Sequence, residues 1–293
     1  MWKEARVHAG LLTVALIYGA NYSVAKFVMP DYVQPFALIL LRVSLACLCF
    51  LALQLFIKSE KIDKKDWWRL IACGFFGVAV NQLFFFKGLS LTSPIHASVL
   101  MLVTPILVLA GAAFVLKEKI KLVRWIGIAL GITGATLLVL SAGKADAVAS
   151  IKGDVMVFIN AASYATYLIL AKPLLQRYSA LTVSFYTFLF ALPIVIPFGL
   201  PELSAINWAQ LPLPVWLSVF FIVFFVTVVA YLLNAWTMTH VSPGVVGSYI
   251  YLQPVLAGLI AIALGQDSLS WQKVIFILLI FAGVYLSRSK VKR

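Results

Sequence analysis

Residues 93–134 read SPIHASVLMLVTPILVLAGAAFVLKEKIKLVRWIGIALGITG, and the fold can be predicted from this segment. This segment lies within residues 81–138, and its pattern of proline, acidic and glycine residues recurs 149 residues later. There residues 242–283 read SPGVVGSYIYLQPVLAGLIAIALGQDSLSWQKVIFILLIFAG. Without a gap, the alignment pairs Ser93-Pro94 with Ser242-Pro243, Pro105 with Pro254, Glu118 with Asp267 and Gly134 with Gly283. A repeat of this length predicts a protein built from two copies of one unit.

The composition places this chain in a membrane. Of its 293 residues 63% are hydrophobic and only 11% are charged, and the mean hydropathy is +1.04. A water-soluble domain of this size could not bury that much apolar surface. A helix needs about 20 apolar residues to cross about 30 Å of hydrocarbon. Continuous apolar runs exclude barrel strands and predict an all-α integral membrane protein with ten transmembrane helices, at 8–28, 34–57, 67–90, 95–116, 122–140, 154–171, 181–198, 215–238, 244–264 and 274–287.

Each copy of the repeat holds five of these spans. We expect the first copy at 1–141, a periplasmic linker at 142–151 and the second copy at 152–293. Because five is odd, the second copy starts on the opposite side of the membrane, so the halves are inverted. Inverted repeats are typical of secondary transporters, whose substrate site lies near the midplane between the halves.

The first span resembles a signal peptide, because Lys3 and Arg6 precede an apolar run and small residues. It nevertheless has a counterpart in the second half. An offset of 146 residues matches Tyr18 with Tyr164 and Lys26 with Lys172. We therefore expect this segment to be an uncleaved transmembrane helix.

The net charge of +13 reports topology and not a nucleic-acid partner. If the N-terminus is cytoplasmic, 17 of the 23 Lys and Arg residues lie in inside segments, and only Lys144, Lys152 and Lys273 lie outside. Positive charge concentrates on the cytoplasmic side of membrane proteins. We therefore expect a multi-pass protein of the cell inner membrane with both termini in the cytoplasm.

Three cations fall within the predicted spans. Lys26 and Lys87 lie near helix ends, where they either extend to lipid headgroups or serve a function. Arg42 lies about eight residues inside its span, so it either bonds backbone carbonyls or faces a polar cavity. No Asp or Glu occupies the middle of a span, so a carboxylate proton relay is missing and the coupling ion is open. No spacing typical of a metal or cofactor site is present.

Polar residues line one stripe on each of two repeat-related helices. The first stripe contains Tyr18, Asn21, Tyr22 and Ala25, and the second contains Asn160, Ser163, Tyr164 and Tyr167. Such residues either hydrogen-bond neighbouring helices or line a cavity, and the pairing of the stripes favours a cavity. Other spans add the remaining candidate lining residues, which are Arg42, Asn81, Gln82, Phe85, Phe86, Ser98, Met101, Thr104, Thr227, Tyr231, Asn234, Tyr249 and Gln253. Polar and aromatic groups together would suit a small zwitterion with an apolar side chain.

Prolines mark the fourth helix of each half. Pro94 and Pro243 follow serines that can cap a helix start. Pro105 and Pro254 lie further along and each removes a backbone hydrogen bond, which predicts a kink. We interpret these as gating helices. In contrast, Gly127, Gly131 and Gly134 form a stripe that favours close helix packing, either as scaffold or in a homodimer.

Together these motifs resemble the EamA type of the drug/metabolite transporter (DMT) superfamily. The similarity covers nearly the whole chain and rests on Tyr18-Gly19-x-Asn21-Tyr22, Leu41-Arg42, Ser93-Pro94, Pro105, Glu118, Gly127-x-x-x-Gly131-x-x-Gly134 and their second-half partners. The chain departs from the family pattern where Tyr18 replaces the common Trp and Asp267 the common Glu. The resemblance implies an inner-membrane carrier of amino acids or other small metabolites, often an exporter.

Two other classes of function compete with a transporter. An intramembrane enzyme acting on lipid or isoprenoid substrates would need an acidic metal cluster or a nucleophile with its base inside the membrane, and the sequence has neither, so no enzyme is predicted. A channel or lipid scramblase stays open. The sequence therefore favours a secondary transporter working by alternating access, with a small-molecule substrate and the lipid bilayer as its partners.

Overall fold

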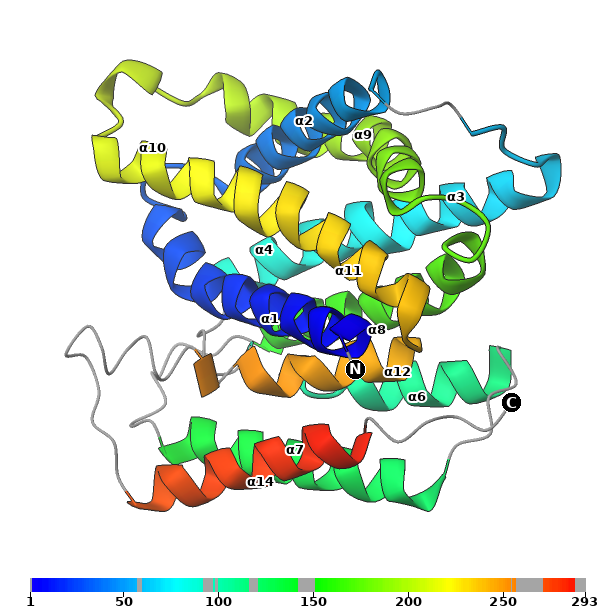
Figure 1. Ribbon diagram of the computed structural model, residues 1–293. Coiled ribbons are helices and arrows are strands. Elements are labelled where there is room, and N and C mark those ends of the chain that lie inside the picture. The colour runs from blue at the N-terminus through cyan, green and yellow to red at the C-terminus, as the bar shows by residue number, and fades with distance from the viewer. Residues whose placement is uncertain are drawn as a thin grey trace.

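A computed structural model describes residues 2–56, 60–91, 97, 100–115, 121–141, 151–253, 255–256 and 271–287 (Figure 1). Within these ranges every regular element is a helix. Those long and apolar enough to cross a membrane are Ala5–Val28, Pro35–Gln54, Lys64–Leu91, Ile151–Leu174, Ala180–Ser204 and Leu213–His240, and shorter apolar helices cover Thr104–Val115, Leu122–Gly134 and Val274–Gly283. The predicted all-helical membrane fold is confirmed.

The elements follow the two-copy order expected from the repeat. The first half contains α1 (Trp2–Val28), α2 (Pro35–Gln54), η1 (Lys64–Asp66), α3 (Trp67–Gly74), η2 (Phe75–Val80), α4 (Asn81–Leu91), α6 (Thr104–Val115) and α7 (Leu122–Ser141). The second half contains α8 (Ile151–Leu174), α9 (Ala180–Ser204), η3 (Trp208–Gln210), α10 (Leu213–Phe220), η4 (Phe221–Val229), α11 (Ala230–His240), α12 (Pro243–Ser248), η5 (Tyr249–Tyr251) and α14 (Trp271–Ser287). Most of the predicted linker lies outside the described residues.

The third span of each half is interrupted by a π-helical segment. In the first half η2 separates α3 from α4, and in the second half η4 separates α10 from α11. The helices that follow, α4 and α11, begin and end 149 residues apart, which is the offset of the sequence repeat. The sequence predicted plain helices here because an apolar run looks the same in both forms. Such wide turns are frequent at functional sites.

α7 and α14 pair closely at one edge of the bundle (Figure 1). A Cβ atom added to Gly283 would lie 2.5 Å from the backbone nitrogen of Gly131 and 2.6 Å from the carbonyl oxygen of Gly127. The two backbones can approach this closely only because these residues are glycines. The glycine stripe is therefore used between repeat-related helices within one chain.

α2 and α9 form a second pair across the halves, and carboxylates fix both of its ends. Glu202 accepts hydrogen bonds from the backbone amides of Phe36 (2.7 Å) and Ala37 (3.1 Å) in the first turn of α2. Glu60 accepts from the amide of Ser179 at the start of α9. Free amides at helix starts are natural partners for carboxylates. α9 reaches this position because it continues to Ser204, past the predicted end at 198.

The helices expected to kink do change geometry. Helical structure is interrupted at residues 102–103, just before Pro105, and residues 249–251 at the equivalent place form the 3₁₀ turn η5. Pro243 occupies the first turn of α12, but the expected capping role of Ser242 is wrong. Its hydroxyl accepts a hydrogen bond from Arg124 (2.9 Å) instead. Pro94, Pro254 and Ser98 lie outside the described residues.

Candidate functional site

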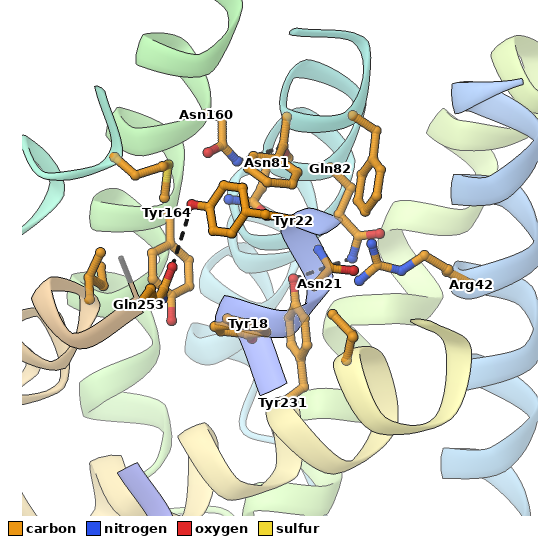
Figure 2. A pocket seen from close by; sticks show the side chains of 15 residues that line it. Tyr18, Asn21, Tyr22, Arg42, Asn81, Gln82, Asn160, Tyr164, Tyr231 and Gln253 are labelled. Carbon is orange, nitrogen blue, oxygen red and sulfur yellow. Dashed lines mark hydrogen bonds between the residues drawn. The ribbon is translucent and has the colours of Figure 1, made fainter. Parts of the chain in front are cut away.

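A cavity lies between the two halves, and both halves line it (Figure 2). It has an empty volume of about 570 Å³, including open solvent at its mouth. The described lining residues are Tyr18, Asn21, Tyr22, Arg42, Asn81, Gln82, Phe85, Phe86, Met101, Asn160, Tyr164, Val226, Tyr231, Ile250 and Gln253.

The two stripes predicted from the repeat meet in this cavity. Tyr18 on α1 and Tyr164 on α8, which are repeat partners, both point toward Asn234 on α11. The amide nitrogen of Asn234 donates to the Tyr164 hydroxyl at 3.1 Å and to the Tyr18 hydroxyl at 3.4 Å. Asn234 is absent from the described cavity wall, so it lies behind the two rings. Its hydrogen bonds to the two hydroxyls orient the rings.

A chain of hydrogen bonds holds a second pair of repeat partners, Gln82 and Tyr231. The amide nitrogen of Gln82 donates to the Tyr231 hydroxyl at 3.3 Å, and that hydroxyl donates to the carbonyl of Gly77 at 3.0 Å. This chain fixes the direction of the Gln82 amide. Its oxygen is buried and has no hydrogen-bond partner among the described residues.

Arg42 lies at one end of the cavity, and Gln253 lies at the opposite end (Figure 2). The Arg42 side chain is 3% exposed, and its Nε donates to the Thr227 hydroxyl at 2.9 Å. The guanidinium carbon lies 4.6 Å from the centre of the Phe86 ring, which suits a cation–π contact. Of the two alternatives left by the sequence, Arg42 faces the polar cavity.

Neutral amides occupy the other end. The amide nitrogen of Asn160 donates to the carbonyl of Asn81 at 2.7 Å, which leaves the Asn160 oxygen buried and without a partner in the described part of the chain. The Tyr22 hydroxyl lies 3.5 Å from the Gln253 amide oxygen, to which it donates. The two ends of the cavity therefore differ in charge.

Some residues that the sequence predicted to line the cavity are absent from its described wall. Tyr167 packs behind it, where a Cβ atom on Gly77 would lie 2.3 Å from the Tyr167 ring. Tyr249 lies against His8, with the hydroxyl 2.7 Å from the ring nitrogen. Lys26 and Lys87 do not line the described cavity. Helical periodicity gives the side of a helix but not the depth, so it could not separate these residues from true lining residues.

Two apolar wall residues, Val226 and Ile250, were missed as lining side chains. Both look like ordinary lipid-facing or core residues in sequence. Val226 reaches the cavity through the π-helical segment η4, and Ile250 through the 3₁₀ turn η5. Their sequence signals were the positions next to the predicted cavity residues Thr227 and Tyr249 and, for Ile250, the backbone carbonyl four residues before Pro254.

The described lining contains a cation, amides and hydroxyls but no carboxylate. Across the described residues, no group of three or more His, Cys, Asp or Glu side chains could hold a metal ion. This set of groups can bind a small polar molecule by hydrogen bonds and charge.

Comparison with known proteins places this geometry in a family. The model of the EamA-like transporter family matches residues 6–140 and 151–289, one match in each half. The chain is 24% identical to the uncharacterized transporter YyaM of Bacillus subtilis (strain 168), over 99% of this chain and 96% of that protein. It is 26% identical to the uncharacterized transporter YetK of the same organism, over 99% and 89%.

A solved crystal structure shares the fold. Its TM-score against this chain is 0.77, at 18% sequence identity, and the match covers 97% of this chain and 96% of the other. The fold, the repeat and the two family matches agree over almost the whole length. The chain belongs to the EamA-like transporter family of the DMT superfamily and is a membrane transporter with two EamA repeats.

Proposed function

We propose that this protein carries small zwitterionic metabolites, foremost amino acids, out of the cell across the inner membrane. The observation that supports this most is the polar cavity lined by both halves. One wall offers a cation and free amide oxygens, and Met101, Phe85, Val226 and Ile250 offer apolar surface. A compact molecule with a charged head and an apolar side chain matches such a lining. Export is the direction that the family resemblance favours.

Alternating access is the proposed mechanism. In this proposal the units 1–141 and 152–293 are inverted, with both termini in the cytoplasm, and they rock about the cavity. The changes of helix geometry before Pro105 and at 249–251 border the cavity and would serve as hinges. In the same proposal Pro94, Pro105, Pro243 and Pro254 are gating residues. A homodimer stays a prediction, to be tested by the mass of the purified protein in detergent.

Transport in proteoliposomes tests the substrate class. Vesicles are preloaded with unlabelled L-leucine, L-methionine, L-phenylalanine or L-threonine, and entry of the same tritiated amino acid is followed. Saturation and counterflow are expected for at least one of them. Leu48→Ala serves as a control because Leu48 is 61% exposed on the outer face of α2. Flux that rises linearly with concentration and shows no counterflow would indicate a channel instead.

Labelling of the loops tests the proposed topology. Tags in 58–66 and in 143–152 are exposed to an impermeant reagent in intact cells and in inverted vesicles. The two segments are expected on opposite sides of the membrane. Labelling of both from the same side would rule out inverted repeats.

A further inference from the structure

We infer that Arg42 binds the carboxylate of the transported molecule, which makes a carboxylate an obligatory feature of the substrate. This inference rests on the proposed function and narrows it. It starts from a buried charge that no acidic side chain of the described cavity lining balances.

Arg42 is held in place but has unused binding capacity. Its Nε donates to Thr227, whose own hydroxyl donates to the carbonyl of Ile222 at 2.8 Å across the wide turns of η4. One face of the guanidinium lies over the Phe86 ring. The NH1 nitrogen is buried and has no hydrogen-bond partner among the described residues. A fixed guanidinium with free N–H groups is the geometry that recognises carboxylates.

The chain has no carboxylate that could neutralise this charge in the membrane interior. All ten acidic residues lie in predicted loops or near the ends of spans: Glu4, Asp31, Glu60, Asp63, Asp66, Glu118, Asp146, Asp154, Glu202 and Asp267. A buried cation without a counter-charge is costly, and intramembrane cations mark functional sites. A bound anion would remove that cost.

The groups beside Arg42 fit the other half of a zwitterion. The oxygens of Asn21 and Gln82 are buried and unpartnered within the described chain, and both residues line the same cavity as Arg42 (Figure 2). Gln82 lies one helical turn before Phe86, whose ring the guanidinium covers. The Gln82 nitrogen is already engaged by Tyr231, so its oxygen is the group left for a ligand. In an amino acid the ammonium is bonded to the carbon that bears the carboxylate. Both charges can therefore bind at this end of the cavity.

The same arrangement selects against simple amines. A molecule that carries only a positive charge would meet the Arg42 cation with no carboxylate to shield it. Repulsion between like charges is strong where water is excluded. The site should therefore reject decarboxylated amino acids even when their apolar part fits.

Four probes of similar shape test this inference on the purified full chain. They are L-leucine, L-leucinamide, 3-methylbutylamine, which lacks the carboxylate, and 4-methylpentanoate, which lacks the amine. Binding of each is measured by titration in detergent, and leucine transport is measured in proteoliposomes. We expect leucine to bind about 10- to 100-fold more tightly than leucinamide or the amine, because charge-assisted bonds are lost. We expect 4-methylpentanoate to bind in an Arg42-dependent manner.

Variants of Arg42 separate a binding role from a structural one. Arg42→Gln should bring the ratio of the leucine affinity to the leucinamide affinity close to one. Arg42→Lys should keep part of the preference for leucine. The ratio is insensitive to the amount of folded protein in a preparation. Arg6→Gln removes an exposed arginine near the start of α1 and should leave the ratio unchanged. If Arg42→Gln does not fold, the wild-type ratio and Arg42→Lys decide.

The possible failures are distinguishable. If leucine is transported but wild-type protein binds leucinamide equally well, the carboxylate assignment is overturned and the proposed function stands. If 4-methylpentanoate binds through Arg42 while leucine is neither bound nor transported, the amino-acid proposal fails and the anion site stands. If no carboxylate probe binds, or if Arg42→Gln weakens leucine and leucinamide by the same factor, the inference about Arg42 is wrong.

Discussion

Two pairs of repeat partners behave differently. Lys26 and Lys172 occupy equivalent positions and make the same kind of contact. Gln82 and Tyr231 also occupy equivalent positions, but their side chains present different chemical groups. Lys26 donates to the carbonyl of Leu89 at 3.4 Å, and Lys172 donates to the carbonyl of Met238, which lies 149 residues further along. Each lysine thus stabilises the C-terminal end of a third span.

The cavity contains a matching pair, Tyr18 and Tyr164, but also the unlike pair Gln82 and Tyr231. There the first half supplies the guanidinium and the Gln82 amide, and the second half supplies a phenol at the matching position. The repeat therefore accounts for the matching helix ends, and this pair makes the two halves of the cavity unlike. In the proposed substrate site, such departures from the repeat would decide what is bound. This contrast can be tested by disturbing each part separately.

The largest effect is expected from Gly283→Ala in the scaffold. The added carbon would lie 2.5 Å from the backbone of Gly131, which cannot move away without separating α7 from α14. We expect a loss of stability of about 3 kcal/mol, seen as a lower midpoint of thermal unfolding in detergent. Gly247→Ala is the control, because its nearest neighbour would lie at 3.5 Å. Equal midpoints for the two variants would contradict the close pairing.

The two lysine contacts should differ in strength. Lys172 also donates to the carbonyl of Val241 at 2.7 Å, whereas among the described residues Lys26 has only its long contact with Leu89. Lys172→Met should cost about 1.5 to 3 kcal/mol and Lys26→Met less than about 1 kcal/mol, since bonds from charged groups are strong only at good geometry. Thermal unfolding of both variants measures the difference. A larger loss for Lys26→Met would reverse the comparison.

A swap across the repeat separates recognition from packing. The double variant Gln82→Tyr with Tyr231→Gln keeps both side-chain types but exchanges their places. We expect it to fold and to bind leucine about tenfold more weakly, because the free amide oxygen has moved away from Arg42. Wild-type affinity in the swapped protein would show that the order of the pair does not matter.

The smaller of the two effects on leucine affinity is expected from Tyr231→Phe. It removes one hydroxyl that links Gln82 to the carbonyl of Gly77 and leaves the ring packing on Phe188 intact. The loss should be about 1 kcal/mol, or about fivefold in leucine affinity. A loss as large as that of the swap would assign recognition to Tyr231 itself.

Much of this architecture followed from the sequence because membranes restrict what a chain can do. Long apolar runs had to be helices, and the spacing of Tyr18, Asn21 and Tyr22 had to form one stripe. The repeat then located the partner stripe on α8. These arguments use only local periodicity and self-similarity, which are both visible in one sequence.

What the sequence missed depends on contacts between distant helices. No local pattern showed that Tyr249 lies against His8 or that the Ser242 hydroxyl accepts from Arg124. The interruptions η2 and η4 were also hidden, because π-helical and α-helical turns use the same apolar residues. Depth within the bundle was the property that periodicity alone could not give.

Substrate protection of cavity residues tests whether the cavity between the halves binds the substrate. In a background with Cys47, Cys49 and Cys73 replaced by Ala, single cysteines are introduced as Asn21→Cys on α1 and Asn160→Cys on α8, with Leu48→Cys as the outer-face control. The rate of reaction with a membrane-permeant maleimide is measured with and without L-leucine. If the cavity between the halves is the binding site, leucine slows labelling at both cavity positions and leaves the control unchanged. Labelling that leucine slows at neither position would contradict this account.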